Sequence, residues 1–152
     1  MRFRPSVAAS IAALTVLGAL ACSGGGTPQQ QIQSRVQSFV THFNEDDAKA
    51  ILDDDVPPSF RRSCSDADAK QTINQARKFG AKLAVKSVSN IAVNGDHAAA
   101  QVVLTTGVGL APQTPAVTVP FVKNAGAWRF DAPSGNGCNN ILPTSLGRGG
   151  SA

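Results

Sequence analysis

The stretch LAVKSVSNIAVNGDHAAAQVVLTT, residues 83–106, decides the fold, because apolar and polar side chains alternate on both sides of Asn94-Gly95-Asp96. Such alternation is typical of half-buried strands, and Asn-Gly between two alternating runs predicts a hairpin. The alternation slips near Ser87 and Val88, which indicates a bulge that curves the first strand. Residues 82–93 and 98–106 are therefore predicted to pair as antiparallel strands.

Two further strands are expected after a loop rich in Gly and Pro at residues 107–115. Residues 117–121 alternate again, although Pro120 restricts how that stretch can pair. Asn124-Ala125-Gly126 predicts another turn, and residues 128–130 alternate in the last strand. The second half of the chain is therefore predicted to be an antiparallel meander.

The residues before this meander have a helical pattern. Thr27-Pro28-Gln29-Gln30 is typical of a helix start, with Thr27 as the cap and Pro at the first helical position. The apolar residues that follow recur at helical spacing and predict one buried stripe: Ile32, Val36, Phe39, Val40 and Phe43. This helix is expected to end near Asn44.

Two shorter helices are expected next. Asn44 is predicted to cap the second, which would bury Ala48, Ile51 and Leu52 and stop before Pro57. After a single turn at residues 59–62, Ser65 is predicted to cap a third helix that stops at Gly80. Ala69, Ile73 and Ala76 line one face of that helix. Helices followed by an antiparallel meander predict an α+β fold of about three helices on about four strands.

The N-terminus has the layout of a bacterial export signal. Arg2 and Arg4 precede an uncharged apolar run at residues 7–21, which is too short to span a bilayer comfortably. Leu17-Gly18-Ala19-Leu20-Ala21-Cys22 fits a lipoprotein cleavage box, whereas Ala19-Leu20-Ala21 also fits an ordinary signal peptidase that would release a soluble protein. The domains expected are a signal peptide at 1–21, a lipidated Cys22 with a flexible linker at 22–27, a single α+β domain at 28–142 and a disordered tail at 143–152.

The cysteine count favours the lipoprotein interpretation. The chain has three cysteines, Cys22, Cys64 and Cys138, and an odd thiol outside the cytoplasm needs an explanation. Lipidation of Cys22 leaves Cys64 and Cys138 for one structural disulfide in an oxidising compartment. These two lack the Cys-x-x-Cys spacing of a redox pair.

Charge and motifs exclude several classes of function. Without Arg2 and Arg4 the net charge falls from +4 to +2, and no basic stripe alternates with aromatics, so no nucleic-acid partner is expected. The acidic runs 45–47 and 53–55 contain no Gly, and helix capping and a solvated surface explain them better than a metal. His42, expected at the surface of a helix end, and His97, in a hairpin, form no zinc or catalytic pattern. No cofactor is expected.

Three helices followed by a bulged sheet are similar to the cone-shaped fold of nuclear transport factor-like and cystatin-like domains. The stretches 83–91, 98–102 and 117–128, with the phrase Phe-Val-Lys-Asn-x-Gly-x-Trp, more narrowly resemble the mycobacterial low-molecular-weight secreted antigen family. That resemblance implies an exported or lipid-anchored actinobacterial envelope protein. Some enzymes of the cone fold place an acid or base in a cavity, and the polar strand positions available for such a pocket are Gln101, Thr105, Arg129 and Asp131. The simpler interpretation is that Asp131 ends a strand and Arg129 faces solvent.

The sequence thus predicts a non-enzymatic lipoprotein, held by palmitate-type acyl chains at Cys22 on the outer face of the cell membrane. Its domain would bind a protein or a small apolar ligand. Two alternatives stay open: a carrier or enzyme that uses a cavity between helices and sheet, and a soluble secreted antigen.

Overall fold

The structure is a computed structural model that describes residues 25–78, 82–106, 115–132 and 137–141. The signal segment 1–21, Cys22, the stop at Gly80, the loop at 107–114 and the tail 143–152 lie outside these ranges.

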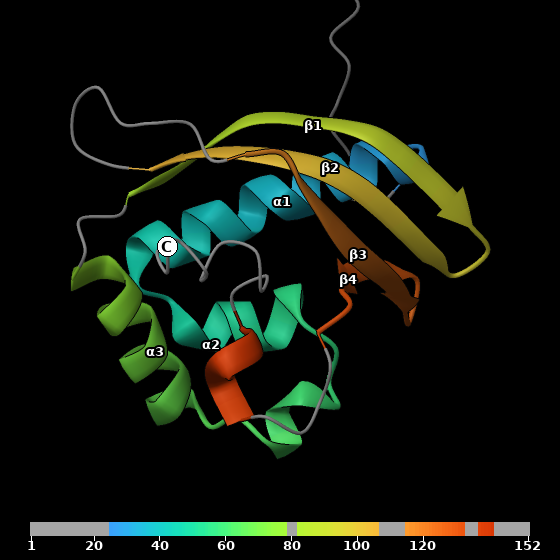
Figure 1. The fold of residues 1–152 in the computed structure, drawn as a ribbon. Helices are drawn as coiled ribbons and strands as arrows, with labels where there is room; N and C mark the ends of the chain where they lie inside the picture. Colours follow the sequence, from blue (N-terminus) through green and yellow to red (C-terminus); the bar gives the residue numbers. More distant parts are fainter. Residues whose placement is uncertain (1–24, 79–81, 107–114, 133–136, 142–152) are drawn as a thin grey trace, which may run out of the picture.

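A curved antiparallel sheet covers the helices (Figure 1). Its strands follow one another in the order β1 (Leu83–Asn94), β2 (His97–Thr106), β3 (Val117–Asn124) and β4 (Ala127–Phe130). The helices α1 (Pro28–Glu45), α2 (Ala48–Ala50) and α3 (Asp66–Lys78) precede the sheet in the chain. The predicted α+β class, with three helices and four strands in the described ranges, is confirmed.

The curvature of the sheet comes from irregular pairing between β1 and β2. The register shifts between Val85 and Ser87, as the sequence predicts, and again between Ser89 and Ala92, which the sequence pattern did not reveal. An extra residue in one strand of a pair bends that strand and increases its twist. The hairpin turn also lies at the predicted place, with Gly95 at a φ of +60°.

Pro120 limits the pairing of β3, as expected. Its carbonyl accepts a hydrogen bond from the Asp131 backbone N–H at 3.0 Å, so this side of the residue faces β4. Proline has no N–H to donate there. Ladder pairing between β3 and β4 accordingly begins one residue later, where Phe121 pairs with Phe130.

The first helix begins with the predicted capping box. Thr27 Oγ1 accepts from the Gln30 N–H at 3.3 Å, and Gln30 Oε1 accepts from the Thr27 N–H at 3.0 Å. The apolar stripe of α1 is buried against the sheet, where the Phe39 and Phe130 rings lie 5.0 Å apart. Among the described residues, no helix is long and apolar enough to cross a membrane.

The prediction that Asn44 caps the second helix is wrong. Asp47 caps α2 instead, and its carboxylate accepts from the Ala50 N–H at 2.9 Å. Asn44 lies within α1, and its side chain bonds to both backbone groups of Leu83: Nδ2 donates to the Leu83 carbonyl at 2.8 Å, and Oδ1 accepts from the Leu83 N–H at 2.9 Å. Local rules favoured a cap, but the start of β1 offered two backbone partners.

Replacing Asn44 by alanine is expected to lower the free energy of unfolding by about 1–3 kcal/mol, because it leaves both polar groups of Leu83 without their partner. Urea unfolding followed by circular dichroism measures this loss. Glu45→Ala is the control, since Glu45 is the exposed neighbour. Equal stability of the two variants would show that Asn44 does not hold β1 to the helix.

The segment after α2 continues as a π-helical turn, η1 (Ile51–Asp55), and ends before the prolines as predicted. A 3-10 turn, η2 (Phe60–Arg62), follows, and Ser65 caps α3 by accepting from the Asp68 N–H at 3.2 Å.

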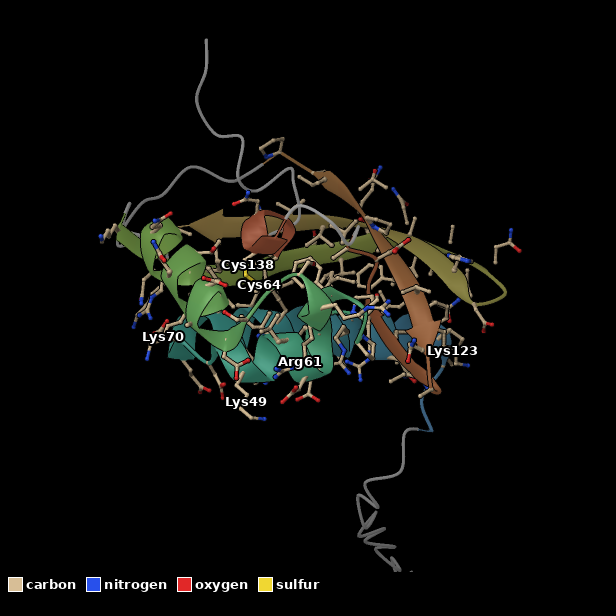
Figure 2. All side chains as sticks on the ribbon, turned by 90° about the horizontal axis from the view of Figure 1, so that it is seen from below. Lys49, Arg61, Cys64, Lys70, Lys123 and Cys138 are labelled. Atoms are coloured by element: carbon tan, nitrogen blue, oxygen red, sulfur yellow. A yellow bond between two sulfur atoms is a disulfide. The ribbon has the colours of Figure 1, made fainter. Side chains whose placement is uncertain are left out.

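The predicted Cys64–Cys138 disulfide is present, with the two Cα atoms 4.9 Å apart (Figure 2). It joins Cys64, two residues before α3, to the 3-10 turn η3 (Gly137–Asn140) that follows the sheet.

Candidate functional site

The most unusual feature inside the molecule is a charged cluster of Arg35, His42 and Asp55, named here the Asp55 cluster. Asp55, at the end of η1, is fully buried. Arg35 donates to its Oδ1 at 3.0 Å, and His42 Nδ1 lies 2.8 Å from its Oδ2. Arg35 and His42 lie seven residues apart on α1, which places both side chains on one face of that helix.

The Asp55 cluster also connects α1 to the sheet. Arg35 uses its Nε to donate to the carbonyl of Trp128 on β4 at 2.9 Å. One guanidinium therefore holds η1 and β4 against α1. Burial raises the pKa of Asp55, and the hydrogen bonds from His42 and Arg35 offset part of that rise.

The interpretation of the acidic run 53–55 as a solvated surface is wrong for Asp55. Asp54 is exposed. Asp53 forms ion pairs with Lys49 and Arg61, whose nearest nitrogens each lie 2.5 Å from its carboxylate. The hydrogen bond from Lys49 has the largest effect and lowers the pKa of Asp53, and the bond from Arg61 lowers it further. The sequence did carry a signal for this burial. Asp55 comes seven residues after Ala48, on the helical face that also holds Ile51 and Leu52.

His42 is likewise not a plain surface residue, since only 20% of its side chain is exposed and it faces Asp55. A His–Asp pair acts in acyl transfer only when a nucleophile bonds to the second ring nitrogen. Within the described residues, no hydroxyl or thiol forms a hydrogen bond with His42. His97 begins β2 and is exposed. The same residues contain no group of three His, Cys, Asp or Glu side chains that could hold a metal ion.

The four polar strand positions considered for a pocket do not converge. Gln101 accepts from Asn90 Nδ2 at 2.7 Å, and Thr105 donates to the Ala84 carbonyl at 3.4 Å, so both bond toward β1. Arg129 lies at the other side of the sheet and bonds toward η1. Asp131 follows β4 and is exposed, in line with the simpler interpretation.

The expectation that Arg129 faces solvent is wrong. Its side chain is half-buried and donates to the backbone carbonyls of Asp53 and Val56, the latter at 3.0 Å. The carbonyls at the end of a helical segment lack partners within the helix, so a cation there is favourable. Arg129 therefore stabilises the end of η1.

A surface hollow of about 460 Å³ lies beside the Asp55 cluster, named here the Trp128 hollow. One wall is the face of α1 from Gln30 to Ser38, which includes Arg35, and the other is Gly126-Ala127-Trp128 in the β3–β4 turn and β4. Gly26 completes the lining. The volume lies in the range usual for small-molecule sites. No motif marks it in the sequence, because its two walls are about 90 residues apart and polar on the α1 side.

The space between α1 and the sheet is, by contrast, filled. Only about 10 Å³ is left among the side chains that line it, which are Val36, Phe39, Val40, Val102, Leu104, Val117, Val119 and Phe130. A volume this small holds at most a single water molecule.

Comparison with known proteins adds no assignment. No protein-family model matches the chain. No curated protein is significantly similar to it, so the resemblance to secreted antigens stays a prediction.

Proposed function

We propose that this chain is a cell-envelope lipoprotein, anchored through Cys22 on the outer face of the cell membrane, with a non-enzymatic binding domain. The observation that carries the proposal is the pairing of Cys64 with Cys138. It uses two of the three cysteines and leaves Cys22, which directly follows a small-residue cleavage site. Disulfides persist in oxidising compartments, which agrees with export.

The start of the domain also supports an anchor at Cys22. The capped helix α1 begins at Pro28, so a linker of a few residues, rich in Gly, would separate the lipid from the fold. A thioether-linked diacylglycerol has two acyl chains, and two chains give stable anchoring where one is marginal.

The packing supports a binding domain rather than a cavity enzyme. Side chains fill the space between α1 and the sheet, and the described residues bring no nucleophile to His42. The Trp128 hollow is an open site among these residues. A protein or small apolar ligand bound from outside fits this arrangement better than a reaction in a closed cavity.

Replacing Cys22 by serine is expected to abolish labelling of the protein by radioactive palmitate. Cleavage by the ordinary signal peptidase at Ala19-Leu20-Ala21 then moves the variant from the membrane pellet to the soluble fraction. Because the lipid is attached at the sulfur, no other cysteine can substitute while Cys64 and Cys138 are paired. Mass spectrometry of the mature N-terminus identifies the modification directly. Globomycin, which blocks the lipoprotein peptidase, should make the uncleaved precursor of the unmodified protein accumulate.

The control is a Ser23→Ala variant, which keeps the cysteine and should label like the unmodified protein. A mature protein with an unmodified Cys22 thiol would contradict the proposal and favour the released, secreted form. A protein that stays in the cytosol would contradict export altogether.

A further inference from the structure

The Trp128 hollow lies at the end of the molecule where α1 begins, next to Gly26. Its lining residue Gly26 is four residues after Cys22, a span of at most about 14 Å of extended chain. The first turns of α1, the β1–β2 turn and the β3–β4 turn lie together at this end (Figure 1). Figure 2 shows Lys123 at the same end, away from the disulfide. If Cys22 is lipidated, the chain therefore holds the hollow within about 14 Å of the anchored residue.

The lining of the hollow combines an apolar wall with a cation. Ala127 provides apolar surface, and Trp128, which is 3% exposed, adds a small edge to it. Arg35 is the charged residue of the lining, and its partner Asp55 is fully buried behind it. Lys123, an exposed second cation, has its Nζ 5.9 Å from the centre of the Trp128 ring. This arrangement complements a ligand with an aliphatic part and a negative charge.

Trp128 also has an unused hydrogen-bond donor. The residue is 3% exposed, and its Nε1 is buried without an acceptor among the described residues. Buried polar groups are normally paired, and leaving one unpaired is unfavourable. A small rotation of the Trp128 ring toward the hollow would let the carboxylate of a ligand supply the missing acceptor.

We propose that the Trp128 hollow binds a single-chain anionic lipid, such as a fatty acid, from the membrane next to the anchor. The aliphatic chain lies against Ala127 and Trp128, and the anionic head pairs with Arg35 and Lys123. This proposal gives a ligand class to the binding domain proposed above. It has its own test, because lipid binding is measured on a chain without the anchor.

The experiment uses the mature chain from residue 22 with Cys22→Ser, and dibromostearate as the probe. Trp128 is the one tryptophan of the protein, so its fluorescence reports on the hollow directly, and bromine quenches an indole that it contacts. Saturable quenching is expected. Ser34→Phe, which fills the hollow from the exposed face of α1, should weaken binding about tenfold or more. Ala127→Leu fills the hollow from the opposite wall and should also weaken binding of the probe.

The matched control is Gln33→Phe, one residue from Ser34, exposed and outside the lining. It should bind like the parent chain. Quenching that does not saturate, or that Ser34→Phe and Gln33→Phe change equally, would overturn the site. Equal quenching by brominated dodecyl maltoside, which is neutral, would overturn the assignment of an anionic head. Failure here leaves the palmitate-labelling result for Cys22 intact.

Discussion

Replacing Cys64 and Cys138 together by alanine is expected to lower the free energy of unfolding by about 4 kcal/mol and the melting temperature by roughly 15 °C. The bond links residues 74 positions apart, so its loss frees a long loop in the unfolded chain. Both cysteines are buried, and alanine avoids adding a polar group at either position. The bond is also the covalent tie between the helical half and the turn that follows the sheet.

Thermal and urea unfolding of the oxidised protein measure this loss. Reducing the unmodified protein should reproduce it, whereas the double alanine variant should not respond to reductant. Two free thiols in the exported protein, or equal stability of the two oxidised samples, would contradict a structural role for the bond.

Local signals in the sequence were sufficient for most of the fold. The capping box at Thr27, the alternation of residues 83–106 and the Asn94-Gly95 turn each depend on neighbouring residues alone, and each is confirmed. The second bulge in β1 and the role of Asn44 depend on a distant strand. A side chain that has a good local partner still takes a tertiary one when the fold brings two backbone groups to it.

The candidate site was harder to predict for the same reason. The Trp128 hollow joins the polar side of α1 to a turn about 90 residues later, and no spacing rule relates the two. The burial of Asp55 was predictable in principle from its i+7 position, but its neighbours Asp53 and Asp54 made the run look solvated. A buried carboxylate is unfavourable unless a cation pairs with it, and Arg35 is the cation that pairs with Asp55.

Replacing Asp55 by alanine is expected to lower the free energy of unfolding by about 3 kcal/mol. The change leaves the Arg35 guanidinium and His42, each about 20% exposed, without the carboxylate that they share. It also loosens the contact of α1 with η1 and, through Arg35, with β4. Asp54→Ala is the matched control, because Asp54 is the exposed neighbour, and its effect should stay within about 0.5 kcal/mol in urea unfolding. Equal losses in the two variants would contradict a role for the Asp55 cluster in stability.

The dependence of this effect on pH has a definite sign. Burial raises the pKa of Asp55 above its usual value of 3.8, so between the two pKa values the folded protein binds more protons than the unfolded chain. The stability contributed by Asp55 is therefore highest below the unfolded pKa and falls as the pH rises through the folded one. The side chain of the Asp55→Asn variant does not titrate. The difference in free energy of unfolding between the parent protein and this variant should therefore shrink as the pH rises from below 3.8 toward neutrality. A gap that widens instead would mean that the bonds from Arg35 and His42 outweigh burial, and that Asp55 is held as a carboxylate.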